Sequence, residues 1–228
     1  MVVYGKRIAE YILAKHSDKI LRVYLAKEID KRQFNAFARL NVPLVRVDSK
    51  KAQSLAKGGN HQGYLLEIEA LEPLEFNMLK AMNFVLVLCG ISDVGNIGAL
   101  FRTAFVLGVD GIIICGLRGF KQEGVLRTSS GAMLDMPFYL ANNPLDIINE
   151  LRFADFKLFG ASLEGEESSV VTKEKKALFL GSEGSGLSAK ILKRMDRNLK
   201  ITQKREFDSL NVSIAGAILI DRMTNGRF

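Results

Sequence analysis

Short apolar runs rich in β-branched residues alternate with helix-length segments along this chain of 228 residues. In the first third, the runs "ILRVYLA", "PLVRV" and "GYLLEIE" predict strands at 20–26, 43–47 and 63–69. The segments around them predict helices at about 5–15, at about 30–40 and from Asp48 or Ser49 onward. This part of the chain is therefore expected to form a compact α/β unit.

A second alternation begins at Phe84. Apolar runs predict strands at 84–89, 111–115, near 136–140, and at 156–162, 177–181 and 198–201, and helices at about 97–107, 144–153 and 209–223. Helices between short strands favour a mostly parallel sheet. The intervening "ALEPLEFNMLKAMN" contains Pro73 and mixed polarity, typical of a linker or connecting helix. We expect a small α/β domain over 1–69, a linker over 70–82 and a larger α/β domain over 83–228.

The basic excess of the chain lies near its start. The formal net charge is +7, in a composition that is 48% hydrophobic and 25% charged. Residues 1–69 contain 13 Lys/Arg against 7 Asp/Glu, whereas residues 70–228 contain 19 against 18. A surplus confined to the first third indicates an acidic partner there, nucleic acid being the commonest, and a solvated basic surface is the alternative.

Cysteines, histidines and apolar runs exclude several classes of protein. Cys89 and Cys115 each end an apolar run, which favours buried reduced thiols over a disulfide. With only His16 and His61 besides them, no cluster has metal-ligand spacing, so we expect no metal. No apolar run reaches about 18 residues, and the first residues lack the pattern of a secretory signal. We expect a cytoplasmic protein.

The stretch "LFLGSEGSGLS", 178–188, has the layout of a buried strand that leads into a ligand loop. Gly181 and Gly186 have the spacing of the outer glycines of a P-loop, but Leu187 occupies the position of its lysine. Glu183 would also repel polyphosphate, at a cost of roughly 1–4 kcal/mol at about 4 Å. Two interpretations remain: a tight turn with positive φ angles, or a loop whose backbone approaches a neutral or cationic ligand beside Glu183.

Two further segments place polar residues near helix starts. In "SDVGNIGALFRTAFVLG", Asn96 and Arg102 follow a strand, where ligands bind in open α/β sheets. Arg102 offers a planar donor fork for phosphate, and an ordinary surface arginine is the alternative. In "DSLNVSIAGAILIDRM", Asp208 or Ser209 is expected to cap the last helix. Ser209 and Asn211 bring a hydroxyl and a carboxamide to that start, and capping explains only one of them.

Together, these three segments resemble the SpoU (TrmH-like) branch of the SPOUT RNA 2′-O-ribose methyltransferases. That family carries N-x-G-x-x-x-R, G-x-E-x-x-G-L and S-L-N-V-S-x-A motifs, which here are Asn96 to Arg102, Gly181 to Leu187 and Ser209 to Ala215, in the same order. "RTSSGA", 127–132, is similar to the family's S-x-G-A segment. The resemblance is strong over 84–228. Over 1–69 it rests on "VYGKRIAEYIL" and "HQGYLLEI", which look like the family's RNA-recruiting domain of ribosomal-protein type.

The resemblance implies a fold and a cofactor. It implies a small N-terminal α/β domain of ribosomal-protein type and a C-terminal SPOUT α/β domain with a deep trefoil knot that holds S-adenosylmethionine in a bent form. The implied cofactor-binding residues are Ala161, Ser162, Leu163, Gly181, Ser182, Glu183, Gly184, Gly186, Ile201, Ser209, Leu210 and Asn211. Relatives often carry proline and methionine after the Ile201 position, where this chain has Thr202, Gln203 and Lys204. The contacts around the adenine are therefore left open.

The implied reaction is methyl transfer to a ribose 2′-hydroxyl, in the manner of enzymes that act on a guanosine in large-subunit rRNA. The implied catalytic residues are Arg102, Asn96, Glu183, Ser209 and Asn211. Arg102 would activate the hydroxyl, by taking its proton or by stabilising the forming alkoxide. Asn96 and Glu183 would orient Arg102 and the ribose, and Ser209 with Asn211 would order the two pockets.

The resemblance also implies an assembly. Relatives build their site across a dimer of knotted domains, and Ile214, Ile218 and Met223 are expected to lie free on the last helix, so we expect a homodimer. A tRNA substrate is an alternative within the same family. A non-catalytic RNA-binding module is another, against which the intact Arg102, Glu183 and Asn211 argue.

Overall fold

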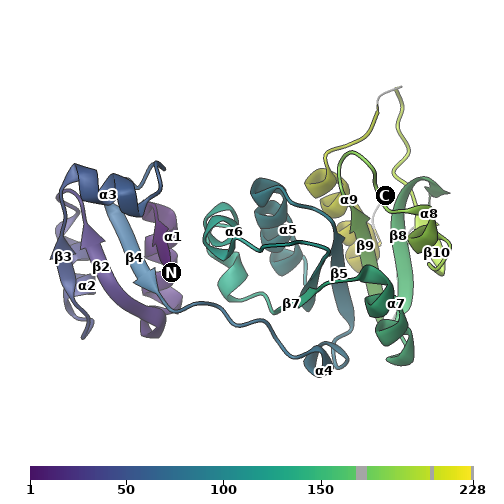
Figure 1. Cartoon of the computed structure of the whole chain (residues 1–228), viewed down its shortest axis with the longest axis horizontal. Coiled ribbons are helices and arrows are strands. Elements are labelled where there is room, and N and C mark those ends of the chain that lie inside the picture. Colours follow the sequence, from purple (N-terminus) through teal and green to yellow (C-terminus); the bar gives the residue numbers. More distant parts are fainter. Residues whose placement is uncertain (168–173, 206–207, 227–228) are drawn as a thin grey trace. The chain divides into compact units, whose positions relative to one another are not determined.

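A computed structural model describes residues 1–167, 174–205 and 208–226 (Figure 1). The chain divides into two compact units. The first unit comprises Met1–Glu72 together with Lys121–Leu134, and the second comprises Pro73–Phe120 together with the described residues from Asp135 onward.

The first unit contains a four-stranded sheet in the order β1-β4-β2-β3. Its strands are Val2–Tyr4 (β1), Ile20–Leu25 (β2), Leu44–Arg46 (β3) and Tyr64–Ile68 (β4), and its helices are Lys6–Lys15 (α1), Lys31–Ala38 (α2), Ser49–Leu55 (α3) and Gln122–Thr128 (α6), with short 3-10 turns at Ser17–Lys19 and Ala132–Leu134. β2 pairs in parallel with β3, whereas β4 is antiparallel to both β1 and β2. Leu65 and Leu66 point to opposite faces of β4 and are both buried, so both faces of this sheet are covered.

The second unit contains a six-stranded sheet in the order β10-β8-β9-β5-β6-β7, and all of its pairings are parallel. Its strands are Phe84–Cys89 (β5), Gly111–Cys115 (β6), Phe138–Ala141 (β7), Lys157–Glu166 (β8), Lys176–Gly181 (β9) and Arg197–Leu199 (β10), and its helices are Phe76–Leu79 (α4), Val94–Val106 (α5), Pro144–Phe153 (α7), Ala189–Leu192 (α8) and Val212–Asn225 (α9). The central strands β5 and β9 are buried along their whole length, which explains why they read as continuous apolar runs.

Helices cover both faces of this second sheet. Phe179 packs with Leu151 of α7 and Ile191 of α8 on one face. On the other face α5 packs against α9 (Figure 1). Gly216 permits this close approach, because a Cβ there would lie 2.5 Å from a methyl carbon of Leu100 and 2.9 Å from one of Leu180.

The mostly parallel sheet predicted from the sequence is confirmed for the second unit, and the first unit has a mixed sheet. Three elements lay outside the prediction: β1, α6 and α8. The prediction that Asp208 or Ser209 caps the last helix was wrong, because α9 begins at Val212 and Asn211 is its N-cap. Helix α5 begins at Val94 rather than near 97, because the Asp93 carboxylate accepts from the backbone N–H of Asn96 over 2.7 Å.

Residues 1–167, 174–205 and 208–226 contain the helices that could be compared with the thickness of a membrane. None of the helices in that part of the chain is both long enough and apolar enough to cross a bilayer.

Candidate active site

Three side chains from distant parts of the sequence form one hydrogen-bonded network in the second unit. Asn96 donates from Nδ2 to Glu183 Oε1 over 2.8 Å. Asn211 donates from Nδ2 to the same carboxylate oxygen over 2.6 Å and to Asn96 Oδ1 over 2.9 Å. We call these three residues the Asn–Glu–Asn network. Each of the three family-like motifs contributes one member.

Local capping interactions explain how the two asparagines are positioned. Asp93 caps α5 and thereby places Asn96 in its first turn. Asn211 caps α9: its Oδ1 accepts from the backbone N–H groups of Ser213 and Ile214 over 2.9 and 3.4 Å, and from the Ser213 hydroxyl over 2.6 Å. With its oxygen engaged by the helix start, the Asn211 amide presents Nδ2 to Glu183.

The loop that carries Glu183 is held by its own backbone. Ser182 and Gly186 form an isolated β-bridge, and the N–H of Gly186 donates to the carbonyl of Ser182 over 2.8 Å. A Cβ at Gly181 would lie 2.0 Å from the carbonyl carbon of Gly186, and Gly186 has a φ of 61°. Both glycines are therefore required by the turn itself. Gly184 differs, because a Cβ there would meet nothing within 4 Å.

The network lies at the carboxyl edge of the parallel sheet. Gly181 ends β9 and pairs in register with Cys89, which ends β5 and pairs with Cys115 at the end of β6. Ligands bind at this edge in open α/β sheets. Both cysteines are buried free thiols, as the sequence predicted, and a hydrogen bond with Cys115 together with burial raises the pKa of the Cys89 thiol.

The other residues expected at the cofactor lie along the neighbouring strands. Ala161, Ser162 and Leu163 belong to β8, and Ala161 follows Gly160, which pairs with Phe179. Ile201 follows β10. The chain before it runs close to the end of β8, since a Cβ at Gly165 would lie 2.5 Å from the carbonyl oxygen of Asn198. Ala161 to Leu163 therefore continue β8 beside the end of β9, where the loop that holds Glu183 begins.

Two glycines at this edge of the sheet leave room for a nucleoside cofactor. Gly184 exposes its backbone, and so does Gly90, which follows β5, since a Cβ at either would meet nothing within 4 Å. Bare backbone of this kind lets an adenosine approach N–H and carbonyl groups without a steric clash. Among the described residues there is no group of three or more His, Cys, Asp and Glu side chains arranged to hold a metal ion.

Two of the five expected catalytic residues lie apart from the network. Arg102 is exposed on α5, and six residues of helix place it about 120° around the axis from Asn96. Ser209 and Leu210 are exposed and precede the cap of α9. In the described part of the chain, no hydrogen bond joins Arg102 or Ser209 to the Asn–Glu–Asn network. The positioning contacts of Asp93 and Ser213 were not predicted from the sequence. Asp93 could have been predicted as an N-cap, because it directly precedes the helical segment that starts at Val94.

An all-parallel α/β sheet with an amide and carboxylate network at its carboxyl edge is the arrangement of a ligand-binding α/β domain. The family model described as SpoU rRNA methylase matches residues 83–221, and the model described as RNA 2′-O ribose methyltransferase substrate binding matches residues 2–74. The chain belongs to the SpoU rRNA methylase family.

Relatives with curated descriptions agree with this assignment. An uncharacterized tRNA/rRNA methyltransferase of Borreliella burgdorferi is 29% identical over 215 residues, covering 87% of this chain and 94% of the relative. The 23S rRNA (guanosine(2553)-2′-O)-methyltransferase RlmP of Bacillus subtilis is 31% identical over 157 residues, covering 68% of this chain and 63% of RlmP.

Solved structures show the same fold. The SpoU methyltransferase AviRb from Streptomyces viridochromogenes, in complex with AdoMet, superposes with a TM-score of 0.79 at 18% identity and covers 99% of this chain and 90% of AviRb. The rRNA methyltransferase from Sinorhizobium meliloti with bound AdoMet superposes with a TM-score of 0.74 at 21% identity, covering 97% of this chain and 85% of that one.

Proposed function

We propose that this protein transfers a methyl group from S-adenosylmethionine to a ribose 2′-hydroxyl of RNA. The Asn–Glu–Asn network carries the proposal, because it unites one residue from each of three family motifs at the ligand-binding edge of the sheet. Family membership and the AdoMet named in the AviRb structure support the cofactor.

The cofactor would be held by backbone and small side chains. Ala161 to Leu163, the Gly181–Gly186 loop and Ile201 would line its pocket, and Ser209 to Asn211 would close it. S-adenosylmethionine supplies an activated methyl group on a sulfonium, so no metal is needed to activate the donor. The proposed trefoil knot would be formed by the chain that runs from β9 through β10 to α9. The approach of Gly165 to Asn198 and the packing of α9 back onto β9 support it.

The protein's part in the reaction is to position and activate the ribose hydroxyl. Arg102 would contact that hydroxyl and stabilise the forming alkoxide while the hydroxyl proton passes to water, since a guanidinium is a fixed cation and hydrogen-bond donor. Glu183, held by Asn96 and Asn211, would fix the relative placement of the two helix starts and of the cofactor loop. Ser213 would act as a positioning residue by holding the Asn211 amide.

We also propose a homodimer. Arg102 lies on an exposed face of α5 that continues into Phe105 and Val106, which are 42% and 71% exposed. Ile214 at the start of α9 is 52% exposed. Burial of these side chains against a second copy would desolvate the surroundings of Arg102 and strengthen its electrostatic effect. Met223 cannot contribute as expected from the sequence, because it is fully buried within the chain.

A guanosine of large-subunit rRNA is the proposed substrate, supported by the similarity to RlmP. A tRNA nucleotide is the second candidate, because several relatives are described as TrmH family tRNA/rRNA methyltransferases. We propose that residues 1–69 recruit the RNA, that residues 70–82 link the two domains, and that residues 83–228 catalyse the methyl transfer. The proposed location of the protein is the cytoplasm. The match of residues 2–74 to the substrate-binding model supports this division.

The deciding experiment maps 2′-O-methylated nucleotides in rRNA and tRNA from cells with and without this protein. One site should lose its methyl group and regain it when the gene is restored. Isothermal titration with S-adenosylmethionine separates the enzyme from a non-catalytic module. No cofactor binding together with no lost methylation site would overturn the proposal.

A further inference from the structure

Helix α2 carries a row of exposed polar residues on one face. Lys31, Arg32, Asn35 and Arg39 recur at helical spacing, and all four are exposed. With Asp30 and Ala36 they line an open groove of about 630 Å³. We call this feature the α2 groove.

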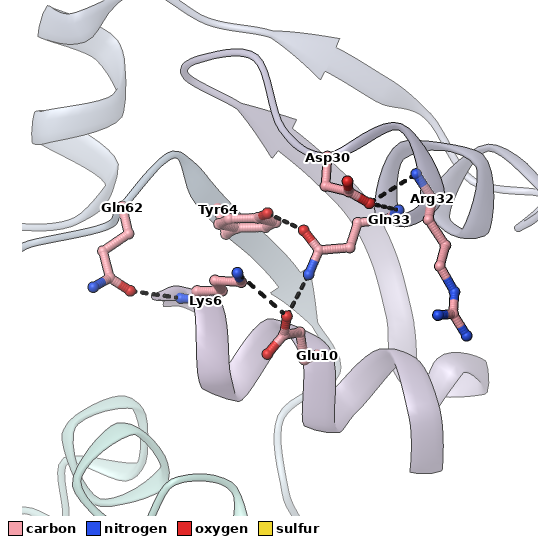
Figure 2. Close-up of polar contacts among 7 residues, drawn as sticks. All are labelled: Lys6, Glu10, Asp30, Arg32, Gln33, Gln62 and Tyr64. Carbon is pink, nitrogen blue, oxygen red and sulfur yellow. Dashed lines mark hydrogen bonds and ion pairs between the residues drawn. The ribbon is translucent and has the colours of Figure 1, made fainter.

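The opposite face of α2 is fixed to the body of the first unit. Phe37 is 1% exposed, and Gln33, one turn earlier on the same face, bridges two neighbouring elements. The Gln33 carbonyl oxygen accepts from the Tyr64 hydroxyl of β4, and its amide nitrogen donates to Glu10 of α1 (Figure 2). Lys6 also contacts Glu10, with its Nζ 3.9 Å from the carboxylate. These contacts orient the α2 groove toward solvent.

The lining of the α2 groove carries an excess of positive charge. Asp30 is the only acidic residue of its lining, and the Asp30 carboxylate caps the helix by accepting from the N–H groups of Arg32 and Gln33 over 2.8 and 3.2 Å. Among the described residues no ion pair involves Lys31, Arg32 or Arg39. In Figure 2 the Arg32 guanidinium extends away from the other side chains that are drawn.

Some other basic residues of the same unit are paired with acids, whereas Lys15, Lys50 and Lys51 are exposed and form no ion pair among the described residues. Arg22 lies 3.6 Å from Glu67, and Lys57 lies 2.5 Å from Glu123. The α2 groove differs in that three cations without an ion pair line one face, in a unit whose first 69 residues carry a surplus of six cations.

We infer that the α2 groove binds the phosphate backbone of the substrate RNA. This inference rests on the proposed function and locates its RNA contact. Three cations and the Asn35 amide spread over about 12 Å of helix can contact neighbouring phosphates of one strand. RNA fits the α2 groove better than a membrane surface does, because Ala36 is the only apolar residue of the lining and an interfacial helix needs a broad apolar face.

The test replaces the three cations together, as Lys31→Gln/Arg32→Gln/Arg39→Gln, in the full chain. The matched control, Lys15→Gln/Lys50→Gln/Lys51→Gln, removes the same charge from exposed positions outside the groove. Binding of a labelled 30-nucleotide single-stranded RNA is titrated at several salt concentrations. The groove variant should lower the logarithmic salt slope by about two and weaken binding about 100-fold at 0.1 M salt. The control should change the slope by less than half as much.

Two further measurements separate the possible failures. Arg32→Lys/Arg39→Lys keeps the charge and should bind RNA within about threefold of the unaltered protein, and S-adenosylmethionine affinity should be the same in every variant. Equal losses in the groove variant and the control, or no loss in either, would overturn the inference. Absence of cofactor-dependent RNA methylation by the unaltered protein would instead overturn the proposed function.

Discussion

The amide nitrogen of Asn211 lies 2.6 Å from a carboxylate oxygen of Glu183, although the two residues are 28 positions apart. That oxygen, Oε1, also accepts from Asn96, so two donors depend on one acceptor. Both donors sit at helix starts, and Glu183 sits on the loop after β9. A change at Glu183 therefore affects the relative placement of three segments that converge on the proposed site.

Glu183→Ala should lower the methyl-transfer rate by about 100-fold or more, because small displacements of positioned groups cost about this much. Glu183→Gln should lose less, since its carbonyl oxygen can still accept both hydrogen bonds. Single-turnover assays with radiolabelled S-adenosylmethionine measure both, with the exposed Glu72→Ala as control. If the glutamine variant were as impaired as the alanine variant, charge rather than network geometry would be the role of Glu183.

Arg102→Ala should abolish methyl transfer with little change in cofactor affinity, because Arg102 lies outside the network and the cofactor loop. Arg102→Lys should not restore the rate, because lysine lacks the planar donor fork. Rates and calorimetric affinities are compared for the three proteins. A rate above about a tenth of the unaltered value would remove Arg102 from its proposed role, since loss of one donor to a developing oxyanion costs about 100-fold or more.

The order of elements could be predicted from the sequence, because the apolar runs of β5, β6 and β9 are buried on both faces and leave an unbroken signal. Short elements gave no such signal. The three residues of β1 and the four of α8 are too few to show a period. The pairing pattern of the first sheet could not be predicted from the sequence either, since strand direction depends on long-range contacts.

The candidate site was predictable in its residue types but not in its grouping. Asn96, Glu183 and Asn211 were identified from motifs, yet their mutual hydrogen bonds depend on how α5 packs against α9. The capping error shows the same limit. Asp208, Ser209 and Asn211 all favour an N-cap position, and Asn211 is selected because its amide also reaches Glu183 and Asn96.

Gly181→Ala should destabilise the protein by about 1–3 kcal/mol and weaken cofactor binding, because the new methyl group would overlap the backbone of Gly186. Gly184→Ala is the matched control on the same loop. Position 184 has space for a Cβ and lies outside the positive-φ region, so the free energy of unfolding of this variant should be unchanged. Urea unfolding measures the first effect. A loss of S-adenosylmethionine affinity in Gly184→Ala without a loss of stability would show that the cofactor approaches this backbone. Equal stability of the two variants would contradict the prediction.

The unaltered protein should have a solution mass near twice the 25.3 kDa of one chain. Val106→Glu and Ile214→Glu should each shift it toward the monomer, because a charge in an apolar interface is costly to desolvate. Phe153→Glu is the control, since Phe153 is 86% exposed on α7, on the other face of the sheet. Light scattering at micromolar concentration provides the masses. A monomeric unaltered protein would refute the dimer.

Burial of Lys176 lowers the pKa of its ammonium group below the ordinary 10.5, although nearby Asp110 acts in the opposite direction. Its Nζ donates to the carbonyl of Met223 near the end of α9 over 2.6 Å. Between the lowered folded-state pKa and 10.5 the unfolded chain binds more protons, so this lysine makes the free energy of unfolding rise with pH across that window.

Lys176→Met should remove this rise. Cys89, whose pKa is raised, acts in the opposite direction in the same range, so the informative quantity is the difference in unfolding free energy between the unaltered protein and the variant. That difference should shift in favour of the unaltered protein as the pH increases through the window that ends at 10.5, the ordinary pKa at which the unfolded lysine titrates. Urea unfolding under reducing conditions at several pH values measures it. A difference that stays constant with pH would mean that Lys176 keeps an ordinary pKa and that its bond to Met223 tolerates the full charge without penalty.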